Sequence, residues 1–275
     1  MNLSITEQLI YSTLIIETNT GSGTGFLFRF LEKNNEYIPA IITNKHVVRN
    51  ANVGRIRFSK ANEEGNPIDN EHEVFLIDDF ENRWIMHPDD DIDLCILPIA
   101  SLIEEANNKG SKLFYVSLSK DLIPTELEIN ELTAMEEIVM IGYPNGIWDS
   151  VNNKPIIRKG VTATHPKFDY NGKMEFMIDA ACFPGSSGSP VMLLNLGNYC
   201  TKDGSIIMGN RVKFLGVMYA GPQHTASGEI RIINVPTRNE AIPITTIPNN
   251  LGCVMKSKKI LDFEIILEGL ITNRI

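Results

Sequence analysis

The chain has 275 residues, of which 43% are hydrophobic and 21% are charged. These proportions are ordinary for a soluble globular protein, and the length allows one large domain or two small ones with a real core. The net charge of −9 at pH 7 argues against broad binding to nucleic acid or to anionic membranes, so neither is an expected partner.

Short apolar or alternating runs recur between turn signals along the whole chain, which is the pattern of an all-β protein. Residues 4–7, Ser-Ile-Thr-Glu, fit a capping box and predict a short N-terminal helix. The most polar segment, 106–136, predicts a connection between two units, 1–115 and 116–275. The predicted strands are 9–17, 25–30, 37–43, 55–58, 73–77, 93–98, 138–142, 155–161, 175–179, 190–194, 214–220 and 229–235.

The chain after residue 244 is shorter than a typical domain of about 50 residues or more. It predicts a terminal helix or strand that packs on the second unit. The apolar contacts expected there are Leu261, Phe263, Ile265, Ile266 and Leu267.

The N-terminal region lacks the marks of a secretion signal. Its first 28 residues contain no Lys or Arg, and the apolar run 9–16 is interrupted by Tyr11, Ser12 and Thr13. No other stretch approaches the length of a membrane span. We therefore expect a cytoplasmic protein.

The cysteines lack Cys-x-x-Cys spacing and lie mostly in apolar surroundings, so we expect buried free thiols rather than a metal site or a disulfide framework. They are Cys95, Cys182, Cys200 and Cys253. Three of the five histidines, His72, His87 and His165, have no partners at metal-ligand spacing and are expected on the surface or in loops. Neither a metal nor another cofactor is expected.

One serine has the surroundings of a nucleophile. Ser187 lies within Asp-Ala-Ala-Cys-Phe-Pro-Gly-Ser-Ser-Gly-Ser-Pro, residues 179–190, a tight turn directly after a strand-like run. A hydroxyl needs an imidazole base, a carboxylate that orients the base, and amide donors for the oxyanion. His46 lies in Thr-Asn-Lys-His-Val-Val, and Asp93 opens Asp-Leu-Cys-Ile-Leu after an acidic loop.

The order of these residues along the chain excludes two other serine-hydrolase architectures. A subtilisin-type site needs an Asp ahead of the His, and no Asp precedes His46. An α/β-hydrolase needs Gly-x-Ser-x-Gly followed by Asp and then His, whereas Ser189 replaces the second glycine. Rival residues remain for the acid, Asp89, Asp90 and Asp91, and for the nucleophile, Ser186 and Ser189.

The three segments resemble those of the chymotrypsin-like serine proteases, most closely the bacterial branch with the HtrA proteases and the staphylococcal glutamyl endopeptidases. Those proteins carry Thr-Asn-x-His-Val-Val, an Asp before a hydrophobic run, and Gly-x-Ser-Gly-Gly/Ser-Pro in the same roles. The resemblance spans roughly residues 10–245. It implies two six-stranded antiparallel Greek-key β-barrels with short terminal helices, and an active site in the cleft between them. Because the tail is short, we do not expect the PDZ domain that is usual in HtrA proteases.

The resemblance implies a role for each site residue. His46 and Asp93 would come from the first barrel and Ser187 from the second, with the amides of Gly185 and Ser187 as the oxyanion hole. The register favours Asp93 and Ser187 over their rivals. Residues 141–146, Ile-Gly-Tyr-Pro-Asn-Gly, resemble a motif that opens the second barrel and are expected to form a structural turn.

Specificity is expected from the strand 216–221, which would pair with the substrate backbone. The predicted substrate-binding residues are Ala181, Cys182, Phe183, Met218, Tyr219 and Gly221. No Asp is placed to hold a basic side chain, and Met218 replaces the histidine of the glutamyl endopeptidases, so a small or medium apolar P1 residue is expected. Gln223 and His224, on the loop that follows, are an alternative that would favour a polar substrate side chain.

The sequence thus predicts a serine endopeptidase of narrow specificity or under regulation, acting on a protein or peptide. A dedicated protein activator is compatible with this prediction, and the oligomeric state is not predicted. One alternative is a catalytically silent or partner-gated peptide-binding scaffold of the same fold. Another is an esterase that uses the same residues on small acyl groups.

Overall fold

The N-terminal helix forms where the capping box predicts it. Helix α1 (Ile5–Tyr11) begins after Ser4, whose hydroxyl accepts from the amide of Glu7 while the Glu7 carboxylate accepts from the amide of Ser4. The helix ends before strand β1 (Thr13–Thr18). The predicted strand 9–17 is therefore wrong in its first part, because the cap commits those residues to a helix.

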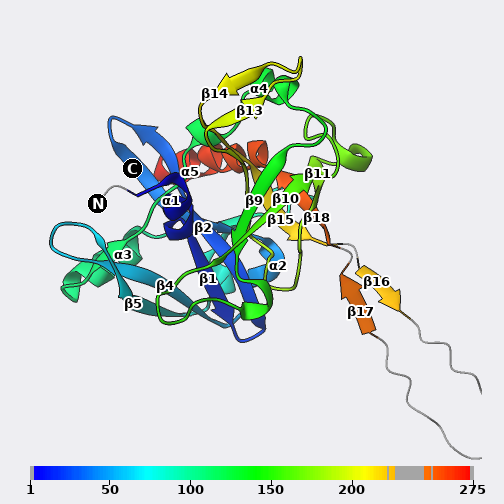
Figure 1. The fold of residues 1–275 in the computed structure, drawn as a ribbon. Coiled ribbons are helices and arrows are strands. Elements are labelled where there is room, and N and C mark those ends of the chain that lie inside the picture. The colour runs from blue at the N-terminus through cyan, green and yellow to red at the C-terminus, as the bar shows by residue number, and fades with distance from the viewer. Residues whose placement is uncertain (1–2, 222, 227–244, 249, 273–275) are drawn as a thin grey trace, which may run out of the picture.

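The computed structural model describes residues 3–221, 223–226, 245–248 and 250–272, with the main chain alone for 223–226 and 245–248. Its strands form two large sheets, which occupy separate regions in Figure 1. The predicted strand 229–235 lies outside the described residues. Among the described residues, no helix is long and apolar enough to cross a membrane.

The first sheet has eight strands in the order β5-β4-β1-β2-β3-β7-β6, with β8 paired to β4. All of its strand pairs are antiparallel. A closed six-stranded barrel was expected here, but the two end strands, β5 and β6, are not paired with each other in the part of the chain that is described. Besides β1, the strands are β2 (Gly21–Lys33), β3 (Glu36–Thr43), β4 (Val53–Ala61), β5 (Pro67–Asp78), β6 (Ile85–Met86), β7 (Cys95–Pro98) and β8 (Lys112–Phe114).

The second sheet is a closed antiparallel barrel in the order β10-β11-β18-β15-β12-β9. This confirms a six-stranded barrel in the second half of the chain. Its strands are β9 (Glu137–Gly142), β10 (Ile156–Thr162), β11 (Glu175–Asp179), β12 (Pro190–Asn195), β15 (Arg211–Ala220) and β18 (Leu251–Lys256). Two hairpins, which the strand pattern did not predict in full, stand outside it: β13 (Asn198–Cys200) with β14 (Ile206–Met208), and β16 (Gln223–Ala226) with β17 (Thr245–Pro248).

The polar segment expected to connect the two units carries several short elements. The elements that lie wholly or partly within residues 106–136 are α3 (Ala100–Asn108), β8, the 3₁₀ helix η2 (Lys120–Leu122) and α4 (Glu126–Glu131). Helix α4 starts at a second capping box, in which Thr125 and Glu128 exchange hydrogen bonds. The other short helices of the chain are α2 (Lys45–Val48), η1 (Glu81–Arg83), η3 (Pro144–Gly146) and η4 (Tyr170–Gly172).

The C-terminal segment does more than pack on the second barrel. Strand β18 lies between β11 and β15 and so completes the barrel. After η5 (Ser257–Leu261), helix α5 (Asp262–Thr272) reaches the first sheet, where the rings of Phe263 and Phe30 lie 6.3 Å apart. Phe263 and Leu267 are buried as expected, whereas Ile265 is 74% exposed because it lies on the opposite face of the helix.

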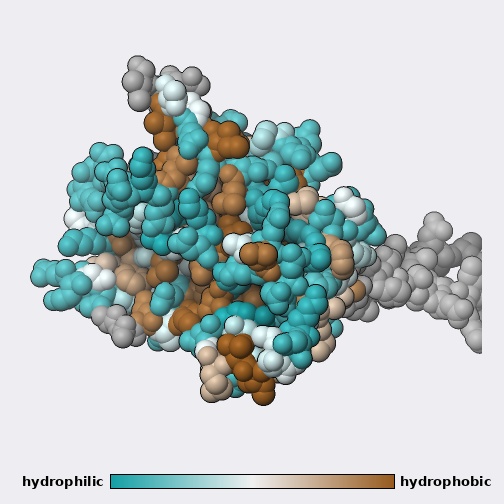
Figure 2. Space-filling model, turned by 90° about the horizontal axis from the view of Figure 1, so that it is seen from above, coloured by the Kyte–Doolittle hydropathy of each residue, from teal (hydrophilic) through white to brown (hydrophobic). Residues whose placement is uncertain are grey.

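One apolar cluster joins the two sheets. It contains Phe26 and Phe28 of β2 together with Phe214 of β15, and the rings of Phe26 and Phe214 lie 5.2 Å apart. Figure 2 shows one outer face, where hydrophobic residues appear in separate groups between hydrophilic ones, as on most globular proteins. The shared cluster fixes the first sheet against the barrel, and the site described below draws residues from both.

All four thiols are free. Cys95 and Cys182 are buried and Cys253 is half-buried, but Cys200 is exposed on the hairpin strand β13. The expectation of burial was therefore wrong for Cys200, because its hairpin stands outside the barrel.

Candidate active site

His46 lies where the first sheet turns into a short helix. Strand β3 ends at Thr43, and α2 then places the imidazole at one end of the sheet. The side chain of Asn44 donates to the main-chain carbonyl of Asp93 at 2.7 Å rather than capping the helix. The segments that carry His46 and Asp93 are thus tied together before their side chains meet.

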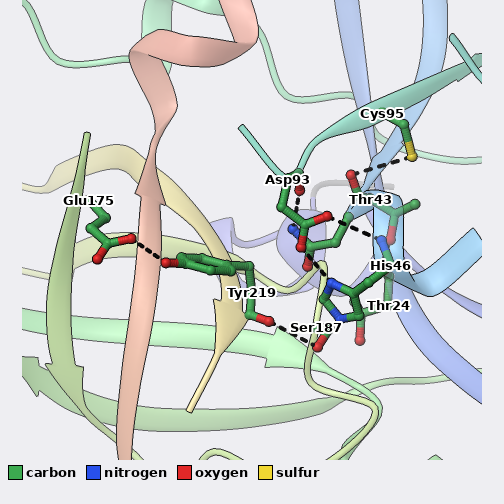
Figure 3. Close-up of polar contacts among 9 residues, drawn as sticks. Thr24, Thr43, His46, Asp93, Cys95, Glu175, Ser187 and Tyr219 are labelled. Atoms are coloured by element: carbon green, nitrogen blue, oxygen red, sulfur yellow. Dashed lines mark hydrogen bonds and ion pairs between the residues drawn. The ribbon is translucent and has the colours of Figure 1, made fainter. Parts of the chain in front are cut away.

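The carboxylate of Asp93 contacts His46 at two points (Figure 3). Its Oδ2 atom lies 2.5 Å from Nδ1 of the imidazole, and its Oδ1 atom accepts from the amide of His46 at 3.1 Å. An ionised carboxylate only accepts hydrogen bonds, so in the neutral imidazole Nδ1 carries the hydrogen and Nε2 keeps its lone pair. This tautomer is the one that can take a proton from a hydroxyl.

The acidic loop before Asp93 is held by a buried histidine. The Nδ1 atom of His87 accepts from the amide of Asp89 at 3.1 Å, so its Nε2 atom donates to the carboxylate of Asp262, also at 3.1 Å. Lys45 donates to the carbonyl of Asp89 at 2.9 Å. His87 lies in a loop, one of the two positions expected for it, but it is only 3% exposed because its ring packs on Phe263 of the C-terminal helix.

Ser187 lies in a turn, residues 183–188, that we call the nucleophile turn. Gly185 and Gly188 adopt φ values of +84° and +88°, a region that favours glycine. The Ser187 hydroxyl donates to the main-chain carbonyl of Tyr219 at 3.4 Å, and no hydrogen bond joins it to His46 among the described residues. Figure 3 shows Ser187 beside the imidazole of His46, with its hydroxyl directed to the carbonyl of Tyr219.

Tyr219 lies at an irregularity of strand β15. The register between β15 and β18 shifts between Met218 and Ala220, which is typical of a β-bulge and changes the direction of the residue within it. The Tyr219 hydroxyl binds the carboxylate of Glu175. Burial and this carboxylate raise the pKa of the phenol above its usual value.

The amides of Gly185 and Ser187 have no hydrogen-bond partner in the described part of the chain. The neighbouring carbonyl of Pro184 accepts from the amide of Asn145 at 2.6 Å. Because the C=O and N–H of a trans peptide point in opposite directions, the amide of Gly185 faces away from the turn at Asn145. The segment expected to be a structural turn therefore also orients a predicted oxyanion donor.

The two rival serines are both buried. Ser186 is buried, and its hydroxyl accepts from Arg158 Nη1 at 2.9 Å and from the amide of Phe183 at 3.3 Å. Arg158 also donates to the carbonyl of Ala181, and burial lowers its pKa. Ser189 is fully buried too. The sequence offered no signal for Arg158, because its contacts join strand β10 to a segment far along the chain.

The predicted substrate-binding residues come from two segments, one leading into the nucleophile turn and one at the end of strand β15. Cys182 and Met218 are buried in an apolar cluster of the barrel, and burial raises the pKa of the Cys182 thiol to about 11. Ala181, Phe183, Tyr219 and Gly221 are half-buried. Gln223 and His224 begin strand β16, where the side chains lie outside the described residues. The choice of P1 residue stays a prediction.

Fold and site together define the class: a β-barrel protein with a His–Asp pair and a serine turn supplied by different sheets. The model of the trypsin-like peptidase domain matches residues 23–198, a range that contains His46, Asp93 and Ser187. The chain belongs to this family. No curated protein matches the chain.

Solved structures with some similarity include inactive proteases. The protease Rv3671c from M. tuberculosis H37Rv in its inactive form has a TM-score of 0.42 and 14% identity, over 92% of this chain and 86% of that one. A serine-to-alanine mutant of the same protein, also inactive, has a TM-score of 0.42 and 13% identity, over 93% and 85%. The scabies mite inactivated protease paralogue S-I1 has a TM-score of 0.43 and 12% identity, over 95% of both chains.

Proposed function

We propose that the protein is a serine endopeptidase that hydrolyses peptide bonds through an acyl-enzyme, with Ser187 as nucleophile, His46 as base and Asp93 as orienting acid. The observation that carries this proposal is the two-point contact between Asp93 and His46, which leaves Nε2 free to accept a proton. Membership of the trypsin-like peptidase family supports a protein or peptide substrate.

The proposed chemistry proceeds in two halves. Ser187 attacks the scissile carbonyl while His46 takes its proton, and Asp93 stabilises the imidazolium that forms. The amides of Gly185 and Ser187, which have no other partner among the described residues, receive the developing oxyanion. His46 then returns the proton to the leaving amine, and a water molecule repeats the sequence to release the acyl group.

The finer features of the proposal follow the resemblance to the HtrA and glutamyl-endopeptidase branch. An N-terminal unit, 1–115, would carry the base and the acid, and a C-terminal unit, 116–275, the nucleophile. The strand 216–221 would pair with the substrate main chain, and the segment around Cys182 would favour a small or medium apolar P1 residue. Narrow specificity or a protein activator would protect the host from the protease.

A partner-gated scaffold is the second candidate, and one observation favours it. The Ser187 hydroxyl is directed to the carbonyl of Tyr219 and not to His46. Hydrogen bonds of catalytic residues are often long or misaligned before substrate binds, so this contact is compatible with both candidates. In the gated case, a partner would have to release Ser187 from Tyr219.

Intact mass after incubation with a fluorophosphonate probe tests the proposal. The wild type, Ser187→Ala and His46→Ala proteins are compared, each with and without cell extract. One adduct on the wild type alone supports an assembled nucleophile and base. An adduct that appears only with extract supports gating, and no adduct on folded wild type under either condition contradicts the proposed activity.

A further inference from the structure

Thr24 of strand β2 is buried between the first sheet and the nucleophile turn, and all of its polar main-chain and side-chain groups are engaged there. Its amide donates to the carbonyl of Ser187 at 2.9 Å, and its hydroxyl lies 2.9 Å from the carbonyl oxygen of Gly185. The amide of Tyr143 lies 3.1 Å from the same hydroxyl, and the Thr43 hydroxyl donates to the carbonyl of Thr24 at 2.7 Å. Thr24 thus joins three separate segments of the site.

The direction of each hydrogen bond follows from the chemistry of the partners. An amide N–H only donates, so the Thr24 hydroxyl accepts from Tyr143. A carbonyl only accepts, so the hydroxyl hydrogen goes to Gly185. A residue with an apolar side chain of the same shape would leave both of these partners without a hydrogen bond.

Two glycines make room for this contact. A Cβ atom on Gly188 would lie 1.9 Å from the carbonyl oxygen of Thr24, and a Cβ atom on Gly142 would lie 2.7 Å from its hydroxyl oxygen. Both distances are far below van der Waals contact. The main chain of the barrel therefore approaches Thr24 as closely as it does only because these positions lack side chains.

Two of the partners of Thr24, Gly185 and Ser187, are the residues whose amides are proposed to bind the oxyanion. Gly185, at φ +84°, has wide conformational freedom, so the peptide groups on both sides of it must be held for its N–H to keep one direction. The carbonyl of Pro184 before it is held by Asn145, and the carbonyl of Gly185 itself is held by Thr24.

We propose that Thr24 is a positioning residue for the oxyanion hole: its hydroxyl fixes the carbonyl of Gly185 so that the amide of Gly185 points at the reacting oxygen. This inference rests on the proposed protease function. Through Thr43, which ends the strand before His46, the same residue also couples the segment of the base to the nucleophile turn. Thr24 and Thr43 are drawn with His46 and Ser187 in Figure 3.

The test compares Thr24→Val, which removes the hydroxyl at nearly constant shape, with Thr24→Ser, which keeps it. Thr162→Val is the matched control. The Thr162 hydroxyl is also buried, accepts from the amide of Glu136 at 2.8 Å and donates to the carbonyl of Ala134 at 2.8 Å. In the part of the chain that the structure describes, no hydrogen bond joins it to the nucleophile turn. The control therefore loses the same pair of hydrogen bonds elsewhere in the barrel.

Three quantities are measured on each protein: the rate of fluorophosphonate labelling, kcat and KM for p-nitrophenyl acetate, and inhibition by phenylboronic acid, whose adduct with a serine mimics the tetrahedral intermediate. Misplacing one oxyanion donor is expected to lower kcat of Thr24→Val about 10- to 100-fold, with KM little changed. Boronate affinity should fall in proportion to kcat/KM. Thr24→Ser and Thr162→Val should remain close to wild type in all three.

The proposal is overturned if Thr24→Val labels and turns over like the wild type, or if Thr162→Val loses as much activity. A wild type that neither labels nor turns over ester contradicts the proposed function instead, which is a different result. If Thr24→Val fails to fold, Thr24→Ala is the second variant without the hydroxyl. Equal boronate affinity in folded Thr24→Ala and Thr24→Ser would then refute the positioning role.

Discussion

Replacing Asp93 by Asn tests the tautomer argument with one atom changed. The amide of His46 donates to Oδ1 of Asp93 at 3.1 Å, and that position must stay an acceptor because a backbone N–H cannot accept. The Asn side chain therefore keeps its oxygen at this position. Its NH₂ group then occupies the position of Oδ2, 2.5 Å from Nδ1 of His46.

This orientation reverses the hydrogen bond to the ring. The NH₂ group donates, so Nδ1 must accept and the ring hydrogen moves to Nε2, the atom that should take the proton of Ser187. The same change in a well-studied protease with this type of triad lowers kcat about 10⁴-fold, which corresponds to about 5 kcal/mol of transition-state stabilisation. We expect a loss of this order for Asp93→Asn.

The assay is the rate of fluorophosphonate labelling, followed by intact mass, together with ester turnover. Asp90→Asn is the control, since Asp90 is an exposed carboxylate in the same loop and was a rival for the same role. It should label at the wild-type rate. Labelling of Asp93→Asn within about tenfold of wild type, far short of the loss expected for a wrong tautomer, would refute the tautomer argument. A large loss in Asp90→Asn would refute the assignment of the acid.

Three further predictions concern neighbouring residues. Gly188→Ala should lower the free energy of unfolding by about 3 kcal/mol or more, seen as a lower thermal midpoint, because its Cβ would overlap the carbonyl oxygen of Thr24 at a φ of +88°. Burial, reinforced by a nearby carboxylate, raises the pKa of the Cys95 thiol well above its usual range. At about pH 8, iodoacetamide should therefore modify the exposed Cys200 and leave Cys95 unmodified, as peptide mass mapping would show. Arg158→Met should slow fluorophosphonate labelling about tenfold, because it removes two hydrogen bonds to the segment around the nucleophile turn. Its thermal midpoint should change little, because the substitution also removes a half-buried cation that has no acidic partner among the described residues. Normal labelling of that variant, or rapid modification of Cys95, would contradict these expectations.

Features that depend on neighbours in the chain were predictable. The capping box at Ser4 and Glu7 produces helix α1 because its hydrogen bonds close within one turn. Alternating apolar runs predicted most strands of both sheets, including β9, β11 and β12 within a residue or two. The segments that carry His46 and Asp93 were recognised from local motifs, and the structure brings these two side chains into contact.

Features that depend on the order of strands in space were not predictable. The run 251–256 is short and carries no distinct strand pattern. It nevertheless closes the barrel, because it pairs with β11 on one side and with β15 on the other. The first sheet holds eight strands rather than six because short segments such as β8 add to it. His87 lies in a loop, as one of its two expected positions has it, but its local sequence did not indicate that the C-terminal helix would cover it.

The sequence by itself determined the all-β class, the capped N-terminal helix and the residue types proposed for the chemistry, since each depends on short-range patterns. Only the tertiary structure decided which groups hold those residues in place. Thr24 and Gly185 are 161 positions apart, and nothing in either local sequence indicates the other. Their hydrogen bond exists because the first sheet packs against the nucleophile turn of the second. This packing buries Thr24 and half-buries Gly185, and a buried polar group requires a partner wherever packing places it.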